Sequence, residues 1–156
     1  MIERRDKTMV DFPSGYRRLE HSERTRAHGA RKTGAAKADE TLSVSIRIRR
    51  NPAAPTLPTL TDHAIMPAGS RKVLTRDDYE KTYGATKEDL NKVVKFATTC
   101  GLKVEEQSSA RRTVRVSGTV AQMEKAFAVE LGQYETATET YRGREQKEDY
   151  RIGSFI

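Results

Sequence analysis

The chain has 156 residues, of which 35% are hydrophobic, and carries a formal net charge of +7. This length suffices for one domain with a hydrophobic core, but the low apolar fraction indicates that part of the chain lies outside that core. A single cysteine excludes an intrachain disulfide and argues against a thiolate zinc site, and no apolar run is long enough to cross a membrane.

The positive charge is concentrated near the N-terminus. Residues 1–50 hold 13 Lys and Arg against 7 Asp and Glu, whereas residues 51–156 hold 16 against 15. Residues 1–40 combine this charge with few large apolar side chains, so we expect a basic, largely flexible leader. Acidic residues interrupt the basic ones, which favours a solvated leader over an arm for nucleic acid or membranes. No signal peptide is visible.

The clearest predicted strand is Leu42–Arg49, where apolar and polar side chains alternate without interruption. Its even-numbered residues face a core and its odd-numbered residues face away. Four prolines between Asn51 and Pro67 then predict an irregular connection.

Two helices follow in the prediction. Thr75 caps a short helix that ends at Gly84. Thr86, with Asp89 three residues later, begins the longest helix, which ends at Gly101. Its expected buried stripe consists of Leu90, Val93, Val94 and Ala97.

The most compact part of the chain is Val114–Tyr134, which is predicted as strand, helix and strand with almost no connecting residues. A strand around Leu102 and Val104 precedes it. Thr119 and Gln122 form a capping box at the start of the helix. The apolar face of this helix comprises Val120, Met123, Ala126 and Phe127. Beyond Tyr134 the pattern is weak.

The element order β–α–β–β–α–β predicts an α+β, ferredoxin-like split βαβ sandwich. We expect a four-stranded antiparallel sheet with two main helices, near residues 87–100 and 120–128, on one face. The residues expected to share one core are Leu42, Val44, Ile46, Leu90, Val94, Val114, Val116, Phe127 and Leu131. Because this architecture hosts many unrelated functions, the fold does not identify the activity.

The sequence contains no recognisable catalytic constellation, metal site or cofactor motif, so we expect none of these. His21, His28 and His63 lack metal-ligand spacing, and Cys100 has no histidine nearby in sequence. Ferredoxin-like RNA-binding modules stack bases on strand aromatics, but the predicted third strand, 113–117, contains no aromatic residue. This argues against specific RNA binding, although a basic arm could bind nucleic acid non-specifically.

From about Thr41 to Gly153 the chain resembles the activation (pro-) domain of sedolisin or kumamolisin-type serine-carboxyl peptidases. The resemblance begins with the Arg-x-Arg-Arg pattern at the end of the first predicted strand. It is carried by Arg47, Arg49, Arg50, Leu74–Tyr79, Tyr83, Gly84, Ala85, Asp89, Leu90, Val93, Val94, Phe96, Gly101, Leu102, Val114, Val116, Gly118, Thr119, Ala126, Phe127, Leu131, Tyr134, Tyr141 and Arg142.

The resemblance implies a secreted folding assistant and inhibitor rather than an enzyme. The peptidase domain of that family, with its catalytic residues and calcium site, has no counterpart in this sequence. We therefore expect residues 41–153 to form the pro-domain and residues 154–156 to begin a truncated linker. The partner is the cognate peptidase domain, in cis or in trans.

The resemblance also implies a docking surface and a tail. The residues expected on the outward sheet face, as the partner interface, are Arg47, Arg49, Lys103, Arg115, Glu130 and Tyr134. Those of the tail directed at the peptidase cleft are Tyr150, Ile152 and Phe155. The alternative hypothesis is a stand-alone ferredoxin-like binding module with a basic arm for nucleic acid.

Overall fold

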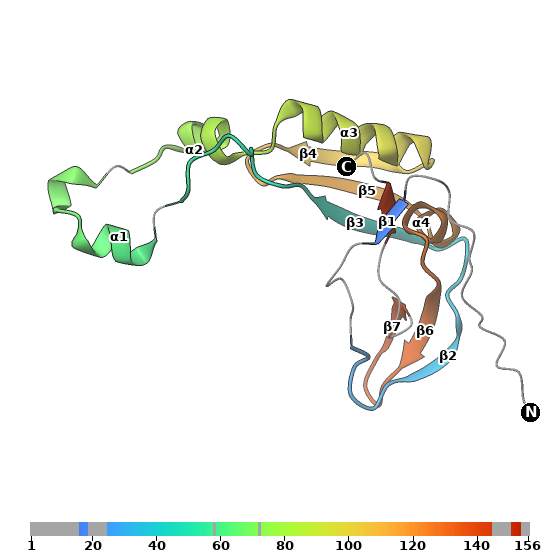
Figure 1. Ribbon diagram of the computed structural model, residues 1–156. Coiled ribbons are helices and arrows are strands. Elements are labelled where there is room, and N and C mark those ends of the chain that lie inside the picture. Colours follow the sequence, from blue (N-terminus) through green and yellow to red (C-terminus); the bar gives the residue numbers. More distant parts are fainter. Residues whose placement is uncertain (1–15, 19–24, 58, 72, 145–150, 154–156) are drawn as a thin grey trace, which may run out of the picture. The chain divides into compact units, whose positions relative to one another are not determined.

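The structure is a computed structural model that describes residues 16–18, 25–57, 59–71, 73–144 and 151–153 (Figure 1). The chain divides into two compact units. We call Thr41–Gly118 the central unit, and Met1–Glu40 together with Thr119–Ile156 the terminal unit. The fold is mixed α and β, with two antiparallel three-stranded sheets.

The central unit is built on a three-stranded sheet with the order β3-β5-β4 (Figure 1). The strands are β3 (Thr41–Arg47), β4 (Lys103–Ser108) and β5 (Thr113–Thr119), and β4 pairs with β5 in antiparallel register. The helices are α2 (Arg76–Tyr83) and α3 (Lys87–Thr99), of which α3 lies against β4.

The predicted helix caps are confirmed. Thr75 and Thr86 each accept a hydrogen bond from the backbone N–H three residues later, at the starts of α2 and α3. Gly84 caps the C-terminal end of α2, and Gly101 follows α3 with a φ of 73°, a conformation that favours glycine.

The core of the central unit lies between the sheet and α3. Its most deeply buried residues are Val93, Phe96, Ala97, Val114 and Val116, each at most 1% exposed. Ile46 and Leu90 are buried as predicted, whereas Leu42, Val44 and Val94 are only half-buried. The alternation of β3 and β5 thus directs one side of each strand towards α3.

The terminal unit contains a second three-stranded sheet, with the order β2-β6-β7. Its strands are β2 (Arg31–Ala35), β6 (Leu131–Glu135) and β7 (Thr140–Arg144). The helix α4 (Val120–Phe127) begins with the predicted Thr119–Gln122 capping box. A short strand pair joins β1 (Tyr16–Arg18) to β8 (Arg151–Gly153). The buried residues here include Val120, Met123, Ala126, Val129 and Tyr134.

The predicted four-stranded sheet is wrong in the placement of its fourth strand. The strand at Leu131–Glu135 exists, but as β6 it pairs on one side with β2 and on the other with β7. The helices α3 and α4 accordingly belong to different units, and Phe127 and Leu131 are half-buried. Alternating hydrophobicity identifies a strand but does not specify its neighbours.

Further elements were not predicted as such. The expected leader, residues 1–40, contains β1 and β2, and every residue of β2 is exposed, so its sequence shows no alternation. The expected irregular connection contains α1 (Leu60–Ile65), which begins with a capping box formed by Thr59 and Asp62, and the short 3-10 helix η1 (Ala68–Ser70) follows it. Within the described ranges, no helix is long and apolar enough to span a membrane.

Candidate functional site

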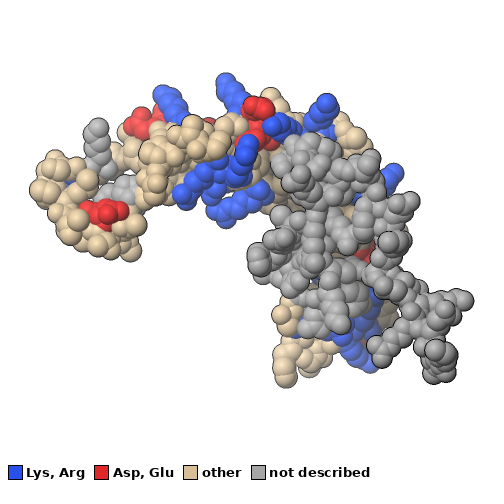
Figure 2. Space-filling model, viewed as in Figure 1, with Lys and Arg blue, Asp and Glu red and all other residues tan. Residues whose placement is uncertain are grey.

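The central sheet presents a polar surface on the side of its strands opposite the core. The exposed side chains that we call the outer face are Ser43, Ser45 and Arg47 from β3, Arg115 from β5, and Lys103, Glu105 and Glu106 from β4. In the view of Figure 2, lysine and arginine side chains gather over the central unit near the end of β3. The outer face is therefore a charged surface on a sheet whose opposite side is buried in the core of the central unit.

A β-bulge gives the outer face two adjacent carboxylates. The register of β4 against β5 shifts between Val104 and Glu106, so Glu106 lies opposite Arg115. The hydroxyl of Ser117 donates to Glu105 Oε1 at 2.6 Å, and Lys103 Nζ lies 3.1 Å from the same oxygen. These contacts, the Ser117 hydrogen bond foremost, hold the pKa of Glu105 below its ordinary value. Glu106 pairs with Arg111.

Two cations of the outer face have no such partner. Neither Arg47 nor Arg115 forms an ion pair or side-chain hydrogen bond with any residue in the described part of the chain. Both side chains are exposed and lie on neighbouring strands. Arg115 attracts Glu105 through space and contributes to the lowered pKa of that carboxyl, but neither arginine has to break a hydrogen bond or ion pair to bind a carboxylate of another molecule.

Three of the six predicted interface residues, Arg47, Lys103 and Arg115, lie together on the outer face. Glu130 and Tyr134 belong to the terminal unit. The prediction that Tyr134 faces outward is wrong, because Tyr134 is 1% exposed and its ring stacks on Tyr141 with the centroids 5.4 Å apart. Glu130 is exposed and pairs with Lys32, whose Nζ lies 3.6 Å from Glu130 Oε1.

Arg49, the remaining predicted interface residue, binds within the central unit. Its Nε and Nη2 donate to the two carboxylate oxygens of Asp89, at 2.8 and 3.1 Å. Asp89 is buried at the start of α3, and the hydrogen bonds from Arg49 are the main cause of its lowered pKa. This pair joins the segment after β3 to α3, so we do not count Arg49 among the free cations.

The predicted tail can be described only in part. Ile152 lies in β8 opposite Arg17, whereas Tyr150 and Phe155 fall outside the described residues. The structure therefore leaves the predicted role of this tail untested.

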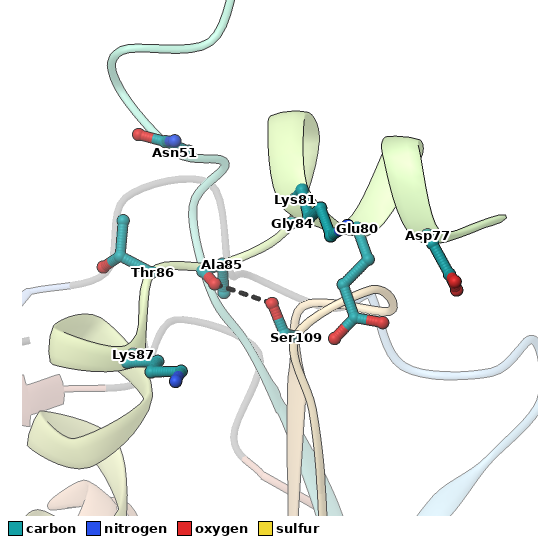
Figure 3. Close-up of a pocket in the computed structure, with 9 residues that line it drawn as sticks. All are labelled: Asn51, Asp77, Glu80, Lys81, Gly84, Ala85, Thr86, Lys87 and Ser109. Carbon is teal, nitrogen blue, oxygen red and sulfur yellow. Dashed lines mark hydrogen bonds between the residues drawn. The ribbon is translucent and has the colours of Figure 1, made fainter. Parts of the chain in front are cut away.

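A second polar feature is a pocket of about 410 Å³ at the junction of α2, α3 and the β4–β5 turn (Figure 3). Its lining residues are Asn51, Asp77, Glu80, Lys81, Gly84, Ala85, Thr86, Lys87 and Ser109. The Ser109 hydroxyl donates to the carbonyl of Ala85 at 2.8 Å, so a carbonyl and not a base holds the hydroxyl proton. We interpret this pocket as a structural junction. In the described part of the chain, no cluster of three metal-ligating side chains occurs.

Comparison with known proteins identifies the domain. The family model described as "Pro-kumamolisin, activation domain" matches residues 28–154. The chain is 27% identical over 116 residues to tripeptidyl-peptidase sed5 of Aspergillus fumigatus, which covers 74% of this chain and 20% of that protein. It is 26% identical over 140 residues to kumamolisin of Bacillus sp. strain MN-32, covering 86% of this chain and 25% of that protein.

The chain thus spans about a quarter or less of the length of these curated relatives. The family match starts at residue 28 and so includes β2 as well as the elements predicted from the sequence. The resemblance inferred from the sequence is confirmed: the chain belongs to the pro-kumamolisin activation domain family.

Proposed function

We propose that this chain is the non-catalytic activation domain of a secreted serine-carboxyl peptidase, acting as its intramolecular chaperone and pH-released inhibitor. The observation that carries the proposal is the family match over residues 28–154. The outer face supplies a surface for the contact, because it is exposed, charged and built on a buried scaffold. The same face would serve a peptidase attached in cis or supplied in trans.

Arg47 and Arg115 provide the electrostatic part of the docking. Each is an exposed cation without an ion pair among the described residues, so carboxylates on the peptidase are the complementary groups. Such charges mainly accelerate association, and their effect weakens as the salt concentration rises.

Release in acid follows from the protonation of those carboxylates. A carboxylate bound to arginine has a lowered pKa, so it strengthens the complex above its unbound pKa of about 4. That contribution is lost as the pH falls through the bound value, because the protonated acid no longer attracts the guanidinium. The direction of the effect is tighter binding near neutrality and weaker binding in acid.

The test is to add the isolated domain to the mature cognate peptidase and to the denatured peptidase during refolding. We expect inhibition near neutral pH, loss of inhibition as the pH falls below about 4, and a higher yield of active enzyme after refolding. A variant with His21, His28 and His63 replaced by Gln should release over the same pH range as the wild type.

Two results would overturn this account. If the histidine variant stays bound in acid while the wild type dissociates near about pH 6, histidine is the trigger and the carboxylate mechanism fails. If the domain leaves the peptidase unaffected but binds single-stranded RNA tightly, the alternative of a binding module with a basic arm is correct.

A further inference from the structure

The large apolar side chains that are most exposed in the described part of the chain all belong to one segment. We call residues 59–71 and 73–75 the exposed arm. Its exposed residues and their exposed fractions are Leu60 at 90%, Ile65 at 78%, Met66 at 41%, Val73 at 92% and Leu74 at 45%. The concentration of such side chains in one connection indicates a segment that another protein recognises.

The arm is ordered by local contacts. Thr59 and Asp62 form the capping box of α1, the N–H of Ser70 donates to the carbonyl of Pro67, and Arg71 Nε donates to the carbonyl of Met66. Each of these bonds spans five residues or fewer. Val73 and Leu74 lie outside the helices and strands, and no hydrogen bond joins them to a described residue.

This arrangement is what an endopeptidase needs from a folded substrate. An active-site cleft accepts a peptide segment whose backbone is free and whose side chains can enter apolar subsites. Most other peptide groups of the central unit lie in helices or paired strands, which must unfold locally before a cleft can bind them. At Val73 and Leu74 the side chains are already exposed, and the following N-cap, Thr75, is extended.

We propose that the Val73–Leu74 peptide bond is an internal cleavage site at which the partner peptidase cuts its own activation domain. This inference rests on the proposed function, since it takes the peptidase as the partner. In the reaction a water molecule adds to the carbonyl carbon of Val73 and the bond to the nitrogen of Leu74 breaks. The products are a carboxyl group on Val73 and an amino group on Leu74, and no other reactant is needed.

Cleavage here would loosen the central unit, which carries the outer face. The cut separates β3 from α2, α3, β4 and β5, which together hold the rest of the central unit. The remaining links to β3 include the Arg49–Asp89 ion pair, the bond from Asn51 N–H to the Gly84 carbonyl at 3.0 Å and that from Ile48 N–H to the Arg112 carbonyl at 2.8 Å. The pairing of β3 with β5, of β2 with β6 and of β1 with β8 also joins residues 1–73 to the rest of the chain, so the cut loosens the central unit while the two fragments stay associated.

The experiment follows the cleavage of the domain by its mature cognate peptidase at about pH 4, with intact-mass analysis of the first fragments. The double variant Val73→Asp and Leu74→Asp replaces both apolar side chains with polar ones, about half of them ionised at this pH. Its matched control is Leu60→Asp with Ile65→Asp, two exposed apolar residues of the same arm. All four positions are exposed, so both variants should fold, which thermal unfolding checks.

We expect the first cut at Val73–Leu74, slowed at least about tenfold in the Val73/Leu74 variant and little changed in the control. The Val73/Leu74 variant should also prolong inhibition. A first cut elsewhere, or equal rates for both variants, overturns the inference even if inhibition is observed. Cleavage at Val73–Leu74 without any inhibition would instead contradict the proposed function and leave the cleavage site standing.

Discussion

Asp89 illustrates how one buried carboxylate serves two local structures. It occupies the third position of α3, where its N–H donates to Thr86, and its carboxylate receives two hydrogen bonds from Arg49. The segment that leaves β3 is thereby fixed to the start of α3. A residue that the sequence suggested only as a helix cap is also a tertiary contact.

Replacing Asp89 by Asn should destabilise the domain at neutral pH by about 1–3 kcal/mol, because Arg49 loses its charged acceptor. The pKa of Asp89 is lowered on folding, so its contribution is complete above the unfolded pKa of about 4 and is lost as the pH falls through the folded value. Urea unfolding of the wild type and the variant should therefore differ at neutral pH and converge in strong acid.

Asp78→Asn is the matched control for this prediction. Asp78 occupies the same capping position in α2, where it accepts a hydrogen bond from Thr75 and no arginine pairs with it among the described residues. Its replacement should have a smaller effect. An equal loss of stability in both variants would show that capping, and not the ion pair, accounts for the effect of Asp89.

Gly84 is required by close packing at the junction shown in Figure 3. A Cβ at this position would lie 2.3 Å from the Glu80 carbonyl oxygen and 2.7 Å from Ser109 Oγ. We expect Gly84→Ala to cost about 1–3 kcal/mol, measured as a lower midpoint of thermal unfolding. Gly69→Ala, where no atom lies within 4 Å of the added carbon, should be close to neutral. Equal stability of the two variants would contradict this.

At the scale of elements, the sequence predicted the helices and strands that have either a periodic pattern of buried apolar residues or capping residues at their ends. Such patterns occur in β3, α2 and α3, and in the stretch that comprises β5, α4 and β6. The strand β2 has none, because it is exposed along its length and pairs with β6 through its backbone. The helix α1 was not predicted, because the neighbouring prolines indicated an irregular connection. Its sequence signal was the Thr59–Asp62 capping box.

The sequence predicted those residues of the candidate site whose exposure follows from the alternation of apolar and polar side chains along a strand. Arg47 and Arg115 alternate with buried residues, so their exposure followed from the sequence. The misplacement of Tyr134 came from assigning β6 to the wrong sheet. The bulge that adds Glu105 and Glu106 to the outer face had one sequence signal, two successive polar residues inside a strand.

The helices α3 and α4 should differ in their sensitivity to deletion of an aromatic side chain. Phe96 of α3 is 1% exposed, so Phe96→Ala should cost about 3–5 kcal/mol. Phe127 of α4 is half-buried, and a loss of about 1–3 kcal/mol is expected for Phe127→Ala. Chemical denaturation of both variants checks the order, and a larger loss at Phe127 would contradict the burial assigned to α4.

At the scale of the whole molecule, the family match extends over parts of both units, whereas the outer face belongs to the central unit alone. The excess positive charge lies in residues 1–50, but of the two arginines that we assign to docking only Arg47 belongs to that range, and both lie on paired strands. We therefore attribute specific binding to individual charges at fixed positions on the sheet and not to the net charge of the chain.

The most direct test of this claim is the inhibition constant of the isolated domain against its mature cognate peptidase, measured near neutral pH. The double reversal of Arg47 and Arg115 to Glu should weaken inhibition by about tenfold or more at low salt, chiefly by slowing association. The control reverses Lys87 and Lys95, two exposed cations of α3, to Glu and changes the net charge equally. Strong weakening by the arginine reversal with little effect of the lysine reversal supports docking through the outer face, whereas equal constants for the two variants contradict it.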